Sequence, residues 1–355
     1  MREQANGQVL LPTIATWIVL DDITNETTFP SVGPRSSSSA FQQIYWQCLL
    51  GFFVSSLKQN PRYRHVLFCN KGLADVEYLP VPAMLLTLGV ELVELPITYR
   101  LPQGAVSKWG NQFYILDIVD FIARTDWPAI IVTDADCVWL KSADGIARAL
   151  QSEPILAYTL TAPEDLCREG DKPINGMTRN RMGEIVAMII GDKSLKAPPY
   201  HGGEFFAASQ MGCRTLSDQT RTLWSRAVEE CFMEDSIKEE AHFLSILYAA
   251  NAVPNYSANP FIRRMWTAFK YWNLRPLDAE LTLWHLPAEK RLGFRRFYKE
   301  IRRPSSRFRQ IDAAAAQEII GHYMGYPRRS LTKLILDALQ KLADHTAAHV
   351  AKLGK

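Results

Sequence analysis

Short apolar runs alternate with longer stretches of helical periodicity in the first part of the chain. Residues 14–20, 65–69 and 90–95 form short apolar runs, which predict three strands. Apolar residues recur at helical spacing over 40–59 and 82–88, which predicts helices between those strands. Strand and helix in alternation are typical of an α/β fold with a doubly wound, mostly parallel sheet that helices cover on both faces.

A later apolar run ends abruptly in two acids. Residues 130–132 predict a buried strand, and Asp134 and Asp136 follow it at once. Two carboxylates two residues apart on an extended backbone point to the same side and repel each other, unless a cation lies between them. Because open α/β sheets bind ligands outside the carboxyl ends of their strands, the pair predicts a Mg²⁺ or Mn²⁺ site there. The ordinary alternative is one helix-capping Asp and one solvated Asp.

Two further segments contain candidate catalytic side chains. The pair Gly202 and Gly203 permits either a sharp turn or a close approach of the backbone to a ligand, and Glu204 follows it directly. Glu239 and Glu240 open an apolar helical segment. Acids at that position also suit the helix dipole without any catalytic role.

Composition narrows the class of protein. The 355 residues have a net charge of only +3, which gives no general case for binding nucleic acid. The six cysteines are scattered without a CxxC pair, which indicates reduced thiols in a reducing compartment. The first residues lack the apolar core of a signal peptide, and no run is long and apolar enough to span a bilayer. We therefore expect a cytoplasmic protein.

The chain changes character near residue 300. A basic connector leads to two predicted helices at 312–323 and 330–353. This predicts an α/β domain over 1–300 and a basic C-terminal helical extension over 301–355. The last helix has apolar residues along one side, which either pack on the main domain or make a peripheral contact with an anionic membrane.

In their order along the chain, these motifs resemble glycosyltransferases of the GT-A fold. That family is a doubly wound α/β domain whose Asp-x-Asp motif binds a metal together with a nucleoside diphosphate sugar. The match here is Asp134-Ala-Asp136. His285 is similar to a late histidine that completes the metal site in several retaining members of the family.

The same resemblance implies which residues contact the donor sugar nucleotide. Lys108, Trp109 and Gln112 fall on a segment similar to the family's donor-contacting helix. Lys290 and Arg291 both fall near a lysine that contacts the diphosphate in the family. The glycine that usually precedes that lysine is absent, so either residue fits the role.

A second resemblance is to blood-group-type galactosyl- and N-acetylgalactosaminyltransferases. Residues 200–209, which include the glycine pair, resemble their acceptor-side strand, and residues 238–244 resemble the start of a helix with catalytic side chains. The resemblance places Glu240 on the catalytic acid and His242 on an acceptor contact. Glu204 is a competing candidate for the catalytic carboxylate.

Together the resemblances imply a hexosyltransferase that uses Mn²⁺ or Mg²⁺. The donor is a nucleoside diphosphate sugar, with a UDP-sugar favoured, and the acceptor is a hydroxyl on a glycan, a lipid or another molecule. The resemblance favours retention at the anomeric carbon, whereas the residues alone leave retention and inversion open.

Two alternatives come from other classes of protein. A haloacid-dehalogenase-type phosphatase would use Asp134 as nucleophile and Asp136 as acid/base, with residues 189–192 as a late acidic motif. That enzyme's nucleophile strand normally begins its domain, whereas three predicted strands precede this one. A non-catalytic sugar-nucleotide-binding protein is the other alternative, because a fold alone never proves turnover.

Overall fold

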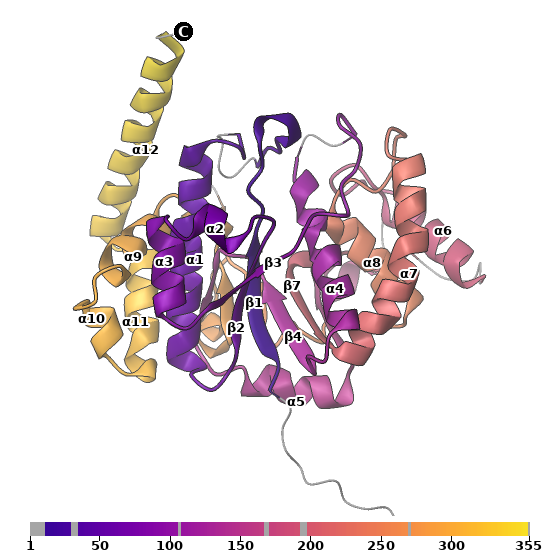
Figure 1. Ribbon diagram of the computed structural model, residues 1–355, viewed down its shortest axis with the longest axis horizontal. Coiled ribbons are helices and arrows are strands. Elements are labelled where there is room, and N and C mark those ends of the chain that lie inside the picture. The colour runs from indigo at the N-terminus through magenta and orange to yellow at the C-terminus, as the bar shows by residue number, and fades with distance from the viewer. Residues whose placement is uncertain are drawn as a thin grey trace, which may run out of the picture.

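A mixed six-stranded sheet forms the central layer of the computed structural model, which describes residues 11–29, 35–105, 108–166, 170–191, 197–268 and 271–353 (Figure 1). Its strand order is β3-β2-β1-β4-β7-β6. The first four of these strands are parallel, whereas β7 is antiparallel to both of its neighbours. The doubly wound, mostly parallel α/β fold is therefore confirmed. The strands are β1 (Thr13–Ile18), β2 (His65–Cys69), β3 (Glu91–Glu94), β4 (Ala129–Thr133), β6 (Ile155–Thr159) and β7 (His201–Ser209).

The central strands are buried on both faces, which explains why they are almost continuously apolar in sequence. Ile131 of β4 points into one buried cluster, and its neighbours Ile130 and Val132 point into the other. Helices α1 (Ser39–Gln59), α2 (Leu73–Val76) and α3 (Pro80–Thr87) cover the first face. Helices α4 (Tyr114–Arg124), α6 (Arg179–Ile190), α7 (Gln210–Glu229) and α8 (Glu240–Ala250) cover the second, and α5 (Asp144–Ser152) closes one end (Figure 1).

A second, three-stranded sheet lies beside the central one. Directly after the two acids, β5 (Cys137–Trp139) pairs antiparallel with β11 (Leu283–His285), which pairs in parallel with β8 (Ile262–Arg264). Strand β11 is short, because a 3₁₀ turn at Pro276–Glu280 precedes it and another at Pro287–Glu289 follows it. A short hairpin of β9 (Thr267–Ala268) and β10 (Tyr271–Trp272) completes the strands.

Two local predictions are corrected. The glycine pair lies inside β7 and does not form a turn, and a Cβ at either glycine would collide with a glutamate side chain of the protein itself. The segment that resembles the donor-contacting helix is not helical at Lys108 and Trp109: Trp109 has a left-handed backbone (φ 56°), residues Gly110–Phe113 form a 3₁₀ turn, and α4 begins only at Tyr114.

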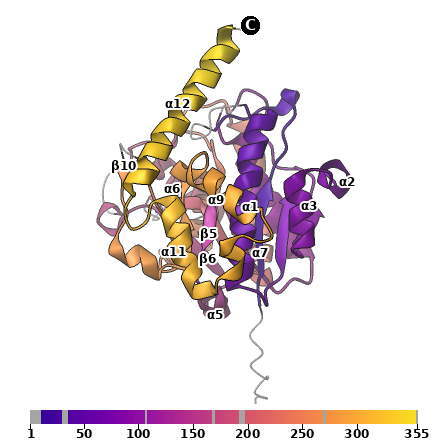
Figure 2. The ribbon, with the colours of Figure 1, turned by 90° about the vertical axis from the view of Figure 1, so that its left-hand side faces the viewer.

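The C-terminal part adds four helices: α9 (Gly293–Ile301), α10 (Arg307–Gln310), α11 (Ala313–Met324) and α12 (Leu331–Leu353). The basic connector is thus largely helical, because Phe294, Phe297 and Ile301 give α9 an apolar face that joins the buried cluster of α1. Helix α12 projects from the body (Figure 2). The division at residue 300 stays a prediction, and it falls in the last turn of α9.

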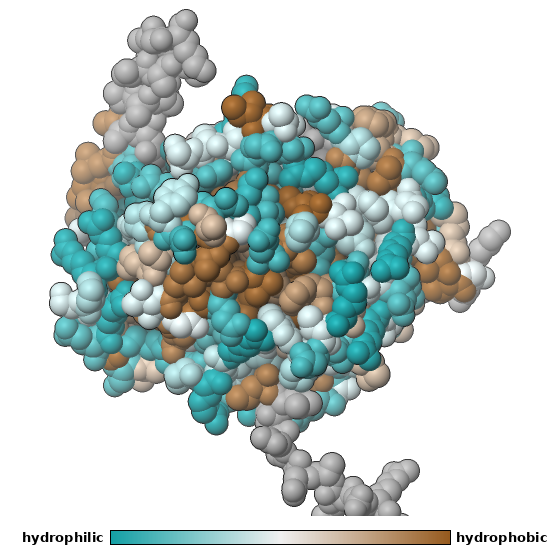
Figure 3. Space-filling model, viewed as in Figure 1, coloured by the Kyte–Doolittle hydropathy of each residue, from teal (hydrophilic) through white to brown (hydrophobic). Residues whose placement is uncertain are grey.

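The surface and the cysteines fit an ordinary globular body. Figure 3 shows a mostly hydrophilic face with an apolar area between α3 and α4. Within the described parts of the chain, no helix combines the length and apolarity needed to cross a bilayer. Cys167 lies outside the described residues, and the other cysteines are buried free thiols: Cys48, Cys69, Cys137, Cys213 and Cys231.

Candidate metal centre and its pocket

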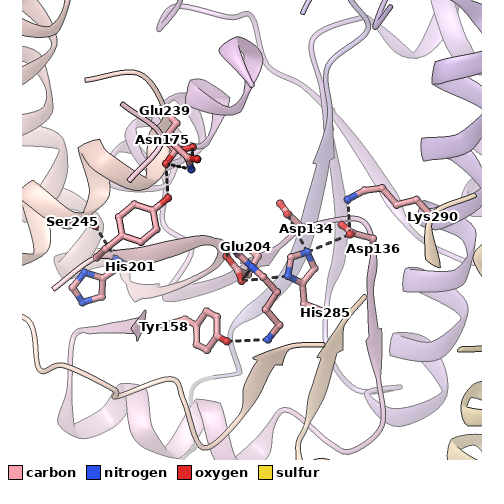
Figure 4. Close-up of polar contacts among 12 residues, drawn as sticks. Asp134, Asp136, Tyr158, Asn175, His201, Glu204, Glu239, Ser245, His285 and Lys290 are labelled. Atoms are coloured by element: carbon pink, nitrogen blue, oxygen red, sulfur yellow. Dashed lines mark hydrogen bonds and ion pairs between the residues drawn. The ribbon is translucent and has the colours of Figure 1, made fainter. Parts of the chain in front are cut away.

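The two acids occupy a tight turn between β4 and β5. The Cys137 N–H donates to the Asp134 carbonyl at 3.1 Å, and the Asp134 N–H donates to the Glu204 carbonyl at 3.1 Å. The extended backbone expected from the sequence is therefore replaced by a turn. Ligand atoms of Asp134, Asp136 and His285 still lie within 4.8 Å of one another (Figure 4).

His285 reaches this cluster from the end of β11. Its Nε2 lies 3.2 Å from Asp136 Oδ2 and 3.5 Å from Asp134 Oδ2, yet makes no hydrogen bond. Its Nδ1 lies 3.3 Å from Glu204 Oε1. Burial acts to lower the pKa of His285, but the neighbouring carboxylates, Asp136 above all, raise it to about 9.

Lys290 supplies a fixed positive charge next to the acids. Its Nζ lies 2.5 Å from Asp136 Oδ2 and 5.8 Å from the centre of the Tyr45 ring. Burial acts to raise the pKa of Asp136, but Lys290 and His285 hold it well below its usual value. Burial and the charge of Asp136 raise the pKa of Asp134 to about 6.

These residues fit a divalent cation. Asp136 and His285 are buried, and His285 Nε2 is a polar atom without a hydrogen bond that faces two carboxylate oxygens. Buried polar atoms normally have a partner, and an orphaned one needs an explanation. Two carboxylates and one imidazole suit Mg²⁺ or Mn²⁺, and the nitrogen ligand favours Mn²⁺.

A pocket of about 420 Å³ opens onto this cluster. Aromatic rings from β1, from α1 and from the segment before α4 line it: Trp17, Phe41, Tyr45 and Trp109. Trp109 was predicted at the site and lines the pocket, whereas Lys108 is exposed and forms a backbone bridge with Thr28. Of the two basic candidates after β11, Lys290 lines the pocket beside Asp136, and Arg291 is half-buried.

Glu240 faces the same pocket from the first turn of α8. With its amide nitrogen turned toward the carboxylate, Gln112 donates to both oxygens of Glu240 at 2.8 Å. Burial, and then the charge of Glu239, raise the pKa of Glu240 well above its usual value. A Cβ at Gly203 would collide with the Glu240 carboxylate, so the glycine makes room for this acid.

Glu239 is held by a different set of partners. Asn175 Nδ2 donates to its two oxygens at 2.9 and 3.0 Å, and the Tyr200 hydroxyl donates to Oε1. His242 lies fully buried behind it, with Nε2 2.8 Å from the Ile174 carbonyl. The predicted acceptor contact of His242 stays a prediction, because the imidazole is used here to hold the 174–177 turn.

Glu204 is tied to an arginine that sequence reasoning missed. Arg264 donates from Nε and from a terminal nitrogen to the two Glu204 oxygens at 2.7 and 2.6 Å. A Cβ at Gly202 would collide with this carboxylate. Arg264 lies in no motif, and only the strand β8 brings it to the site. Asn175 and Tyr45 lie in no motif either and were also missed, whereas Gln112 was expected on the donor side and lines the pocket.

We compared the sequence and the structure with those of known proteins. No family model and no curated protein matches the sequence. Among solved structures, this chain is similar to the apo form of mouse xyloside xylosyltransferase 1, at 7% sequence identity and a TM-score of 0.46. The match covers 77% of this chain and 97% of that one.

Proposed function

We propose that this protein is a metal-dependent glycosyltransferase. It would move a hexosyl group from a nucleoside diphosphate sugar, with a UDP-sugar favoured, to a hydroxyl on a glycan, a lipid or another acceptor. One observation carries the proposal: Asp134, Asp136 and His285 converge beside Lys290 in an aromatic-lined pocket, and Glu240 lies in the same pocket. Fold alone would not support it.

The first task of such an enzyme is to stabilise the departing diphosphate. Mn²⁺ or Mg²⁺, held by Asp134, Asp136 and His285, would supply Lewis-acid stabilisation of that negative charge. Lys290 presents a fixed ammonium group at the same place, where it can bind a phosphate oxygen. The aromatic rings of Trp109 and Tyr45 suit the planar base of a nucleotide.

The second task is to manage a sugar that becomes cation-like as the diphosphate leaves. Glu240 is our candidate, because its carboxyl group faces the pocket and Gln112 holds it in place. It can stabilise the cation, attack it or orient the acceptor hydroxyl. Glu204 is less suited, because Arg264 engages both of its oxygens.

Thermal unfolding of the full chain tests the proposal. A ligand that binds only the folded protein raises the melting temperature, by about 4 °C at 100-fold excess over its dissociation constant. We expect UDP with Mn²⁺ to do this, and Asp136→Asn to abolish the rise. Glu318→Gln, on the exposed side of α11, is the control that should keep it. If UDP, GDP and TDP all fail with Mn²⁺ present, the proposal is wrong.

The same variant separates the two alternative functions. A phosphatase that uses Asp134 and Asp136 would release phosphate from small phosphate esters, and Asp136→Asn would stop that release. A non-catalytic binder would show nucleotide-dependent stabilisation but no turnover to lose. The late acidic residue of the phosphatase motif, Asp192, lies outside the described residues.

We also propose a peripheral membrane contact through α12. The support is a row of exposed apolar side chains on this helix: Leu331, Ile335, Leu339 and Leu342. A row of this kind on a surface helix is suited to the boundary between lipid headgroups and acyl chains.

A further inference from the structure

A buried line of polar groups leads from β8 to the metal ligands. Arg264 of β8 holds Glu204 of β7, and Glu204 Oε1 lies 3.3 Å from Nδ1 of His285. The opposite nitrogen of His285 lies 3.2 Å from Asp136 and 3.5 Å from Asp134. The Glu204 side chain is 1% exposed and the His285 side chain 5%, so water has little access to this line (Figure 4).

We infer that Glu204, held by Arg264, is a positioning residue that orients His285 toward a divalent cation. The inference rests on the proposed metal-dependent function. An ionised carboxylate accepts hydrogen bonds and cannot donate them, so the imidazole nitrogen beside it carries the hydrogen. A histidine that binds a metal must be neutral, and its lone pair is then on Nε2, the atom that faces the two aspartates. Carboxylates beside metal-bound histidines commonly act in this way.

Three features keep Glu204 in this role. Strand pairing puts Arg264 directly beside His285, because these two residues are partners in the β8–β11 register. The Tyr158 hydroxyl accepts the Arg264 backbone N–H at 2.9 Å, which fixes the strand at that point. Gly202 leaves the space that the Glu204 carboxylate fills.

Alternative uses of Glu204 fit the geometry less well. The sequence suggested it as a catalytic carboxylate, but both of its oxygens are engaged by Arg264 and one also faces His285. An unpaired Glu204 would add a further negative charge to a site that already contains Asp134, Asp136 and Glu240. The arginine fork removes that repulsion and fixes the direction of the carboxylate.

The test measures Mn²⁺ affinity directly, by the paramagnetic resonance signal of free Mn²⁺ titrated with the metal-free full chain. We expect Glu204→Gln to weaken binding by about 10-fold to 100-fold. Loss of one negative charge near the ion would also weaken binding, so this variant alone does not separate position from charge.

The Arg264→Lys variant distinguishes an effect of position from an effect of charge. Lysine keeps the positive charge but loses the two-pronged contact that fixes Glu204. A positioning role predicts about a 10-fold loss of Mn²⁺ affinity in this variant, whereas a pure charge effect predicts none. Unchanged affinity in Arg264→Lys would overturn the inference.

A matched control lies one residue away. Arg263 forms the same two-pronged contact with the buried carboxylate of Asp278, which is not one of the pocket-lining residues. Asp278→Asn should lower the melting temperature and leave Mn²⁺ affinity unchanged. If the wild-type chain binds no Mn²⁺, the proposed function fails; if it binds and the Glu204 and Arg264 variants bind equally well, only the positioning role fails.

Discussion

His65 is buried at the start of β2 and makes the chain sensitive to acid. Its Nδ1 lies 2.9 Å from the Tyr63 carbonyl, and its Nε2 lies 2.8 Å from the Ser56 hydroxyl. One nitrogen donates and the other accepts, which suits a neutral ring. Burial lowers the pKa of His65 from 6.5 to about 4.

We therefore predict that the free energy of unfolding falls as the pH drops from 6.5 to 4. Between these pH values, His65 is protonated in the unfolded chain but not in the folded one. The free energy of unfolding therefore has its full value above pH 6.5 and decreases toward pH 4. The loss reaches on the order of 3 kcal/mol. Urea unfolding between pH 7 and 4.5 measures it, and His65→Gln should flatten the slope. If the free energy of unfolding of His65→Gln depends on pH as steeply as that of the wild type, the prediction is wrong. His322→Gln, at an exposed site, is the control and should keep the wild-type slope.

At the residue scale, the sequence identified part of the site. Asp134 and Asp136 follow a buried strand directly, so residue type and position alone indicated a metal site. His285 was added by resemblance, and the structure brings it within 4.8 Å of both acids. Arg264 could not have been found, because it lies 60 residues from Glu204 and its role depends on pairing between β8 and β11.

At the element scale, periodicity predicted the long helices and the buried strands β1, β2 and β4 well, because each of these strands is a short apolar run. It did not predict the sheet of β5, β11 and β8. Those strands have three residues each, and the pairing of β5 with β11 joins segments more than 100 residues apart. The direction of β7 is likewise set by tertiary packing and leaves no mark in the local pattern.

Helix α12 faces the body with its polar side. Lys333 Nζ donates to Glu289 Oε2 at 2.8 Å and to Asp337 Oδ2 at 3.0 Å, and Arg296 donates to Asp337 at 2.5 Å. Glu289 also accepts hydrogen bonds from Thr267 and from the Gly293 N–H. Because Glu289 directly precedes Lys290, the helix braces the turn that brings the lysine to the metal centre.

We predict that Lys333→Met lowers stability and weakens nucleotide binding together. Removing one partner of a buried ion pair costs about 3–5 kcal/mol, because it leaves the other charge buried. The turn at Glu289 should then hold Lys290 less well, so the affinity for UDP with Mn²⁺ should fall. Calorimetric titration at a temperature where the variant is folded measures this. Lys341→Met, at an exposed position on α12, is the control. If Lys333→Met leaves the affinity for UDP unchanged, the contacts between α12 and Glu289 contribute to stability alone.

At the scale of the whole molecule, α12 rises at the same end as the carboxyl ends of the parallel strands, and the metal centre lies at that edge of the sheet (Figure 1). Because the polar contacts of Lys333 and Asp337 hold one side of α12 against the body, its apolar row faces outward. Leu331 is 73% exposed, Ile335 52% and Leu339 57%. Exposed apolar rows of this kind mark interaction surfaces. A membrane at this row would lie on the same side of the molecule as the candidate metal centre.

Vesicle flotation tests the proposed contact. We expect the full chain to float with phosphatidylcholine vesicles that contain phosphatidylglycerol, and less with phosphatidylcholine alone, because anionic lipid attracts the basic C-terminal segment. Burying one leucine or isoleucine side chain is worth about 1.5–3 kcal/mol, so Ile335→Glu and Leu339→Glu should each weaken vesicle binding at least about 10-fold. Leu277→Glu replaces a leucine outside α12 that is even more exposed, and it should change nothing. The membrane proposal is wrong if the chain binds neither kind of vesicle and instead forms dimers that Ile335→Glu dissociates. In that case the apolar row binds a second copy of the chain.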